Sequence, residues 1–390
     1  MSVPAPKIVI APDSFKGSLS AEAVAAAVTA GLRRVWPDAR CIAVPMADGG
    51  EGTLDACLSA GGERRRMTIA GASGAPLAAE LGIVERDGRR VAIVEIAQAV
   101  GITEPVGMSI SVAARTTRGV GELMRHALDL GLRDFLVGLG GSSTNDGGAG
   151  LLMGLGARFL DHDGREVHPS PGSLSRLARI ALDDFDPRIA ECRITLMSDV
   201  NNPLAGPRGA TAIFGPQKGV TPDEHPAFDA AIAHFAVLAN QAFGVDAAER
   251  PGAGAAGGLG YALQLLGGEF RSGAEVVADL LGLDAALSGA DWAITGEGRT
   301  DAQTLLGKTP FVVARRALQQ HVPVTLLSGA VDRAALPALG KIYSGCFSLV
   351  FGPTTLERAI ADAPELLADS AEQLARLRTA GALPEASGGA

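Results

Sequence analysis

Cysteine and histidine are scarce in this chain. Its 390 residues include four cysteines and six histidines. The cysteines lie far apart and form no CxxC pair, and the histidines have no HExxH or similar spacing. A disulfide framework and a zinc site are therefore not expected. This cysteine usage fits the reducing cytoplasm, and we expect any bound metal to be held by oxygen atoms.

Basic clusters and long apolar runs are also missing. The 34 basic and 43 acidic residues give a formal charge of −9, and no basic group is interleaved with aromatic residues, so nucleic acid is not an expected partner. The N-terminal apolar run ends at Asp13, too early for a signal peptide. The longest uncharged stretch, 251–268, is too rich in glycine and slightly too short to cross a bilayer. We expect a soluble cytoplasmic protein with no membrane partner.

Short β-branched runs alternate with helical patterns at both ends of the chain. Strands are predicted at 7–11, 41–44, 292–295, 324–327 and 347–351, with helices between them and from 355 onward. This alternation is typical of a parallel sheet, which the two ends could share. In the middle, segments 77–84 and 90–96 flank Asp87-Gly88 and predict an antiparallel hairpin.

The length suits about two domains. We expect a two-domain α/β fold in which 1–75 and 287–375 form a discontinuous, Rossmann-like parallel-sheet domain. A second α/β domain with a mixed sheet is expected to be inserted at 76–286. The last residues, 376–390, carry few apolar side chains and are predicted to be a disordered tail.

Glycine is abundant, with 51 residues, and the glycine-rich segment 138–157 (GLGGSSTNDGGAGLLMGLGA) is the most informative part of the sequence. It follows an apolar strand-like run and then becomes helical. Glycines allow close approach of the backbone, and N–H groups at a helix N-terminus favour negative charge, so the segment could cradle a phosphate or a carboxylate. The alternative is a tight turn capped by Asp146, with no ligand.

Charged and glycine-rich loops follow several predicted strands, where sites of parallel sheets usually lie. They are 12–18, 46–53, 198–204, 215–219 and 296–301. Lysines that offset phosphate charge, carboxylates that hold Mg²⁺ and glycines that admit phosphates are what phosphoryl transfer requires. A single Asp after a strand is also a common helix cap, so it is the recurrence of the pattern that favours a functional interpretation. The sequence contains no GxSxG elbow, so it does not indicate a hydrolase of that type.

Two segments nearly match nucleotide-binding motifs. Gly307-Lys308-Thr309 resembles the end of a P-loop, but Ala302 stands where that motif needs glycine. The segment 252–257 matches GxGxxG, but no buried strand precedes it, so a nicotinamide-dependent dehydrogenase is disfavoured. Its small residues could serve close helix packing or the approach of a ligand, and the sequence leaves both open.

Seven motifs occur in order along nearly the whole chain: IAPDSFKGSLS, PMADGGEGT, GLGGSSTNDGGAG, SDVNNPL, FGPQKG, PGAGAAGGLG and ITGEGRTD. Together they closely resemble the bacterial type I glycerate kinase (glycerate 2-kinase) family. The resemblance implies ATP- and Mg²⁺-dependent phosphorylation of D-glycerate, at the 2-hydroxyl, to give 2-phosphoglycerate and ADP. It also implies two α/β domains, one inserted in the other, with the catalytic site in their cleft.

The resemblance places candidate site residues in these loops, and their individual roles are our inference. Asp199 is expected to accept or orient the substrate hydroxyl proton, and Lys16 and Arg299 to screen the phosphoryl group or the glycerate carboxylate. Asp48 or Asp301 is expected to hold Mg²⁺. The candidate substrate- and phosphate-binding residues are Ser14, Asp48, Gly140, Gly141, Ser142, Asn145, Asn202, Lys218 and Glu297.

Several alternatives stay open at this point. The product could be 3-phosphoglycerate, the substrate could be another small hydroxyacid, or the protein could be a non-catalytic sensor of carboxylates or phosphates. The sequence does not distinguish a monomer from a homodimer. The segment 115–119 departs from the family, in which this run is rich in hydroxyl residues and does not begin with an arginine. We expect Arg115 to be a solvated loop residue rather than a cation that tunes carboxylate binding.

Overall fold

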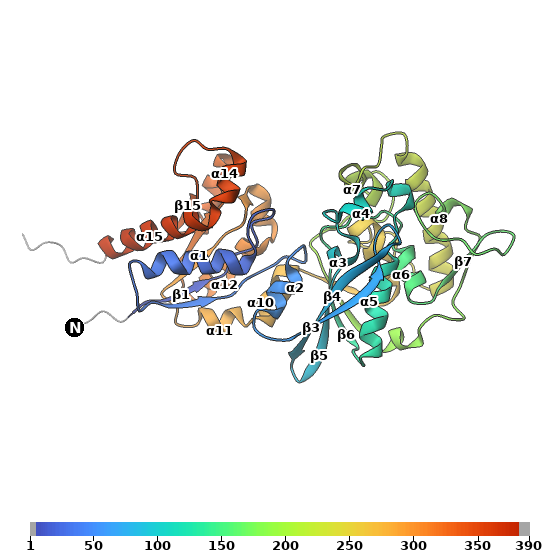
Figure 1. Cartoon of the computed structure of the whole chain (residues 1–390), viewed down its shortest axis with the longest axis horizontal. Helices are drawn as coiled ribbons and strands as arrows, with labels where there is room; N and C mark the ends of the chain where they lie inside the picture. Colours follow the sequence, from blue (N-terminus) through green and yellow to red (C-terminus); the bar gives the residue numbers. More distant parts are fainter. Residues whose placement is uncertain (1–4, 382–390) are drawn as a thin grey trace, which may run out of the picture. The chain divides into compact units, whose positions relative to one another are not determined.

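The computed structural model describes residues 5–381 and divides into two compact units. Unit 1 contains the described residues up to Asp48 and those from Ala274 onward, and unit 2 contains Gly49–Gly273 (Figure 1). No helix within residues 5–381 has the length and apolar character needed to cross a membrane.

Unit 1 is built on a five-stranded parallel sheet to which both ends of the chain contribute, as predicted. Its order is β15-β13-β11-β1-β2, and β1 pairs with β2 on one side and β11 on the other. The strands are β1 (Lys7–Ile10), β2 (Arg40–Ala43), β11 (Trp292–Thr295), β13 (Val324–Ser328) and β15 (Gly345–Ser348). The last strand was predicted at 347–351, whereas in the structure β15 begins at Gly345 and ends at Ser348.

Helices flank the unit 1 sheet. Ser20 caps α1 (Ala21–Arg33) by accepting a hydrogen bond from Ala23 N, as the sequence predicted. Along α1 runs α15 (Ala363–Gly381), and buried side chains of both helices pack with β1 and β11 (Figure 1). The other helices of unit 1 are α10 (Gly273–Leu280), α11 (Leu283–Leu287), α12 (Thr309–Gln319), α13 (Leu336–Leu339) and α14 (Leu356–Ala361).

The predicted disordered tail begins too early. Residues 376–381 continue α15, and the Arg378 guanidinium lies 4.8 Å from the centre of the Trp292 ring. A cation over an indole face is a favourable contact, which the low apolar content of this segment does not reveal. Residues 382–390 lie outside the described part of the chain.

Unit 2 is built on a mixed six-stranded sheet with the order β10-β9-β6-β5-β4-β3. The predicted hairpin is confirmed: β4 and β5 pair antiparallel, and Asp87 and Gly88 both have positive φ, as a two-residue hairpin turn requires. From β5 to β10 the neighbouring strands are parallel. The strands are β3 (Glu63–Ala70), β4 (Pro76–Arg86), β5 (Arg89–Glu95), β6 (Asp134–Gly138), β9 (Arg193–Met197) and β10 (Glu269–Arg271).

One face of this sheet packs against helices to form the larger core, in which Phe135, Val137 and Leu196 meet Leu123 and Phe235. The helices of unit 2 are α2 (Thr53–Leu58), α3 (Ala97–Val100), α4 (Pro105–Met108), α5 (Arg118–Asp129), α6 (Ala149–Gly154), α7 (Ala210–Lys218), α8 (His225–Phe243) and α9 (Leu259–Leu265). A small antiparallel pair, β7 (Arg158–Leu160) and β8 (Arg179–Ala181), completes it.

The chain passes between the units after Asp48 and before Ala274, whereas the sequence placed these points after residues 75 and 286. Residues 49–75 join unit 2 because β3 pairs with β4 and α2 packs on the same hairpin. Residues from Ala274 join unit 1, where Arg316 of α12 binds three acidic side chains of α10 and α11. Neither set of long-range contacts has a local signature in the sequence.

Candidate active site

In unit 1, the loops after β1, β2 and β11 meet at the carboxyl edge of the parallel sheet. Asp13 N donates to Gly296 O at 2.9 Å, and Met46 N donates to Pro12 O at 2.8 Å. These bonds bring Asp13, Asp48 and the loop of Glu297 to one edge, as expected for consecutive strand ends.

Asp13 is a further candidate site residue, outside the set predicted from the sequence. Its side chain is buried, and the Ser14 amide donates to Oδ1 at 2.7 Å. Burial and, to a smaller extent, the nearby Asp48 carboxylate raise the pKa of Asp13 to about 7, against the lowering effects of the Ser14 amide and Lys16. A buried carboxyl beside a second one at a strand end is typical of a functional site. Its place directly after β1 was the available signal.

Glu297 supports its own loop. Its Oε1 accepts hydrogen bonds from the hydroxyls of Thr304, at 2.6 Å, and Thr300, at 3.1 Å. The side chain is buried, and burial raises its pKa, while the Thr304 hydroxyl and Lys308 lower it. These contacts point into the protein, so they favour a loop-holding role over the expected contact with substrate.

The remaining unit 1 candidates lie nearer the surface. Lys16 and Arg299 are exposed, and Ser14 is half-buried. Asp301 caps the short helix η5 (Ala302–Leu306), accepting a hydrogen bond from Gln303 N at 2.8 Å. The helix-cap alternative is thus observed for Asp301.

In unit 2, the glycine-rich segment leaves β6 and lies directly against residues 49–50. Gly140 N donates to Gly49 O at 2.9 Å, and a Cβ on Gly140 would lie only 2.4 Å from Gly50 Cα, so this position admits glycine alone. Leu139 N donates to Met197 O, at the end of β9, shortly before the exposed Asp199. The structure therefore brings the start of the segment and the Asp199 loop to one edge of the sheet.

The N-terminus of α6 already has an anion, and that anion belongs to the protein. Asp146 is fully buried and accepts hydrogen bonds from Thr117 N and Oγ1, both at 2.8 Å, and from Gly148 N and Gly150 N. Burial raises its pKa, and the four donated bonds oppose that shift. Asp146 therefore binds the N–H groups at this helix end, as the capping alternative expected, and the cradle for an external anion stays a prediction for the first residues of the segment.

Asn145, a predicted phosphate ligand, is also buried. Its Nδ2 donates to Thr211 Oγ1 of α7 at 3.0 Å. Gly140 and Gly141 are the parts of the segment that reach the surface, with Ser142 next to them. Only the first residues of the segment are therefore placed to meet a substrate.

Lys218 lies behind the segment. It belongs to the last turn of α7, not to a loop after a strand as the sequence analysis assumed, and its side chain is 1% exposed. Its Nζ donates to Ser142 Oγ at 2.8 Å and to Thr144 O at 2.7 Å. Burial lowers its pKa to about 7, while Asp146 raises the pKa and Arg115 lowers it. The direct phosphate contact expected of Lys218 is replaced by contacts with the segment.

Arg115 is buried, so the expectation of a solvated residue is wrong. Its Nη1 donates to Ser143 O at 3.0 Å and to Lys218 O at 2.9 Å, and Nε and Nη2 donate to Ile110 O. Burial lowers its pKa. Five donors in a fixed plane let one arginine bind several carbonyl oxygens.

The GxGxxG-like segment packs against the glycine-rich segment. Gly147 N donates to Gly257 O at 2.9 Å, and a Cβ on Gly257 would lie 2.0 Å from Thr144 O. Of the two uses that the sequence left open, the structure shows close packing. Asn202 also serves local structure, because its Nδ2 donates to Arg208 O at 2.8 Å and closes that loop.

Comparison with known proteins places this geometry in a family. The model of the glycerate kinase family matches residues 8–379. The chain belongs to the glycerate kinase family. It is 41% identical to a glycerate kinase from Bacillus subtilis and 40% identical to glycerate 2-kinase from Escherichia coli, each over 95% of this chain and 97% of the relative. As a member of this family it is an enzyme, and the sensor alternative is set aside.

A solved structure supports the fold of this glycerate kinase family member. The crystal structure of a candidate glycerate kinase 2 from Salmonella typhimurium LT2 is 42% identical and has a TM-score of 0.83. The match covers 97% of this chain and 99% of that one. The predicted α/β class with a parallel sheet and a mixed sheet is thereby confirmed.

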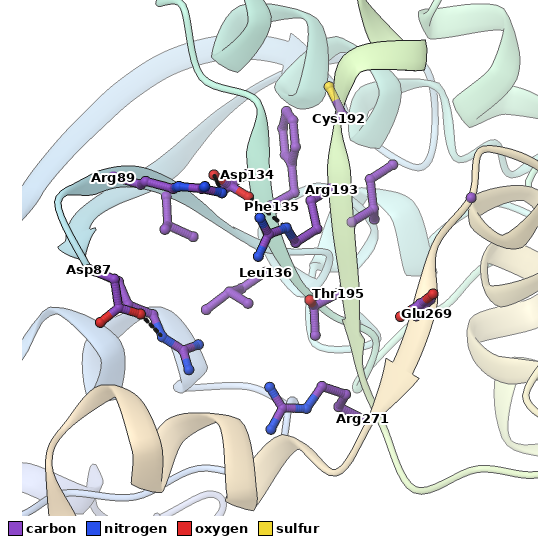
Figure 2. A pocket seen from close by; sticks show the side chains of 14 residues that line it. Asp87, Arg89, Asp134, Phe135, Leu136, Cys192, Arg193, Thr195, Glu269 and Arg271 are labelled. Carbon is purple, nitrogen blue, oxygen red and sulfur yellow. Dashed lines mark ion pairs between the residues drawn. The ribbon is translucent and has the colours of Figure 1, made fainter.

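Unit 2 of this family member also has a hollow of about 770 Å³ away from these motifs, at the starts of β5, β6 and β9. Figure 2 shows Arg89 and Arg193 reaching Asp134 from two sides, at 3.9 and 3.3 Å. No residue of the seven motifs lines it. The hollow is thus separate from the candidate site residues.

Proposed function

We propose that this chain transfers the γ-phosphoryl group of ATP to the 2-hydroxyl of D-glycerate, giving 2-phosphoglycerate and ADP, with Mg²⁺ as cofactor. One observation carries the proposal: carboxylates, exposed cations and tightly packed glycines occupy strand ends in a chain that matches E. coli glycerate 2-kinase over 95% of its length. Phosphoryl transfer needs positioning and charge compensation, and these groups supply both.

Asp199 is the proposed proton acceptor. Its side chain is exposed at the end of β9, next to the start of the glycine-rich segment. As the glycerate oxygen forms its bond to the γ-phosphorus, the bond from phosphorus to the ADP oxygen breaks, and the hydroxyl proton passes to the Asp199 carboxylate. A carboxylate in this role needs only access and orientation.

Lys16 and Arg299 are the proposed partners of negative charge. Both are exposed at the carboxyl edge of the unit 1 sheet and can reach solvent-borne anions. Arginine binds a carboxylate or phosphate through two parallel bonds, and lysine acts as a point charge. Ser14 lies in the same loop as Lys16. Within unit 2, Gly141 and Ser142 are proposed to bind an anion through a backbone N–H and a hydroxyl.

The residues at the unit 1 edge fit a magnesium ion. Mg²⁺ is usually held by one or two carboxylates together with waters and substrate phosphates. Asp13 and Asp48 bring two carboxylates close enough to repel each other, and a divalent cation would offset that repulsion and the charge of the phosphates. Within residues 5–381 no set of three or more His, Cys, Asp or Glu forms a larger metal cage. We assign Mg²⁺ to Asp48, with Asp13 beside it, in preference to the helix-capping Asp301.

The cellular setting follows from the same proposal. ATP and D-glycerate are small soluble partners, and all four cysteines are free thiols, which suits a reducing cytoplasm.

The test is ADP release measured with a coupled assay, with and without D-glycerate and Mg²⁺. We expect turnover that depends on both. Asp199→Asn should keep the fold and lower kcat at least ~10²-fold, the usual scale for a positioned acid–base group. Asp183→Asn is the matched control, because Asp183 is exposed and forms only a surface ion pair with Arg158. Turnover near the parent value in Asp199→Asn would remove Asp199 from this role.

A further inference from the structure

Three buried charged side chains converge behind the glycine-rich segment of unit 2. Lys218 comes from α7, Arg115 from the residues before α5, and Asp146 from the segment itself. Their exposed fractions are 1%, 3% and 0%. Burying three charges is costly unless each is bound by good partners, so their contacts indicate what they hold in place.

Lys218 and Arg115 hold three successive residues of this segment. Lys218 Nζ binds Ser142 Oγ and Thr144 O, and Arg115 Nη1 binds Ser143 O between them. Hydrogen bonds from charged donors are roughly twice as strong as neutral ones. The turn 142–144 is therefore bound by two basic side chains, Lys218 and Arg115.

The two cations are also tied to each other. Arg115 Nη1 donates to Lys218 O, at the C-terminal end of α7, where a positive charge is favoured by the free carbonyls and the helix dipole. Their mutual repulsion is offset by Asp146, whose charge favours the protonated form of Lys218. Arg115, the end of α7 and the turn thus form one connected cluster.

The turn also has bonds to residues 100–102, since Ser143 N and Oγ both donate to Val100 O, at 2.8 and 2.9 Å, and Ile102 N donates to Gly141 O at 2.7 Å. Thr144 Oγ1 and Asn145 Oδ1 are buried without a hydrogen-bond partner within residues 5–381. Unpaired buried oxygens do not hold a turn in one position. Its place therefore depends on these bonds to residues 100–102, on the contacts of Gly140 with residues 49–50 and on the two basic side chains behind it.

We propose that Lys218 and Arg115 are positioning residues that hold the turn 142–144, and through it Gly141 and Ser142, in the geometry needed for phosphoryl transfer. The proposal rests on the proposed function. It replaces the direct phosphate contact expected of Lys218 by an indirect role, and it gives Arg115 a role that the sequence did not assign.

The main test variant is Lys218→Met, which keeps the length and removes both hydrogen bonds to the turn. We expect hydrogen exchange, followed by mass spectrometry on the full-length protein, to speed up in peptides covering 140–148. We also expect kcat to fall at least 10-fold, with KM for ATP and for D-glycerate within threefold of the parent. A loss confined to kcat is what misplacement of a transition-state contact produces.

A matched control separates positioning from general loss of stability. Leu128→Ala removes a buried side chain from the core of the same unit, at the end of α5 beside the start of β6, whereas the turn follows the other end of β6. It should lower the melting temperature and leave kcat and the exchange of 140–148 unchanged below that temperature. If Lys218→Met does not fold, Arg115→Met gives the same test through Ser143 O.

Unchanged exchange at 140–148 in the folded variant would overturn the proposal, and so would faster exchange with parental kcat. A rise in KM alone would also overturn it. The exchange measurement needs no substrate. A parent enzyme that does not phosphorylate D-glycerate would therefore contradict the proposed function, while the exchange result would still decide whether the two cations hold the turn.

Discussion

Replacing Gly140 with alanine should abolish most of the activity and leave the protein folded. The new Cβ would lie 2.4 Å from Gly50 Cα, 3.1 Å from Gly50 N and 3.3 Å from Gly49 O. All three neighbours are backbone atoms, so no side-chain rotation relieves the contact. The glycine-rich segment and residues 49–50 must move apart.

The size of the movement follows from ordinary contact distances. Carbon atoms rest about 3.5–4.0 Å apart, so Gly140 and Gly50 must separate by roughly 1 Å or more. This would break the 2.9 Å bond from Gly140 N to Gly49 O. Overpacking of this kind costs about 1–3 kcal/mol of unfolding free energy, and a 1 Å misplacement of reacting groups lowers turnover about 10²-fold.

The assay is kcat from coupled ADP release, with thermal melting followed by circular dichroism. Gly71→Ala is the control, because Gly71 is also buried in unit 2 but its Cβ would make only ordinary contacts at 3.4 Å. We expect parental kcat in the control. A folded Gly140→Ala protein with kcat within threefold of the parent would refute the claim that this junction positions the reaction.

Three further variants test other parts of the account. Asp146→Asn should lower the unfolding free energy by about 2–4 kcal/mol, because an amide cannot accept all four donated bonds; urea unfolding measures this, and parental stability would contradict it. In the folded state Asp13 keeps its proton up to a pKa of about 7, whereas the ordinary value, which applies to the unfolded chain, is 3.8. The unfolding free energy should therefore fall as the pH rises from 4 to 7. Asp13→Asn should therefore make the unfolding free energy less dependent on pH in this range, and an unchanged pH dependence would contradict the raised pKa of Asp13. Arg316→Leu leaves three acidic partners unpaired and should destabilise unit 1 by about 2–4 kcal/mol; an unchanged denaturation midpoint would be the contrary result.

Features that depend on neighbouring residues were predictable from the sequence. The Asp87-Gly88 turn requires two positive φ angles, and the pair of residues that tolerates them marks the hairpin directly. The Ser20 cap and the strands β1, β2, β11 and β13 follow in the same way from local pattern. The order of the seven motifs was enough to identify the family.

Features that depend on residues distant in the sequence were not predictable. FGPQKG (214–219) has the composition of a loop. In the structure it forms the last part of α7, with Pro216 inside the helix and Gly219 as the C-cap. A lysine beside glycines suggests a phosphate site, and nothing local shows that Lys218 points inward to Ser142. Asp13 stood in a recognised loop, but its pairing with Asp48 comes from the order of the strands in the sheet.

The central claim is that this chain is a kinase acting on the 2-hydroxyl of D-glycerate. The most direct test is ³¹P NMR of the purified protein with ATP, Mg²⁺ and D-glycerate, beside a sample without glycerate. The account predicts a new phosphomonoester signal that matches added 2-phosphoglycerate, together with ADP. A signal that matches 3-phosphoglycerate would contradict the proposed regiochemistry, and the absence of any new phosphomonoester would contradict glycerate as the substrate.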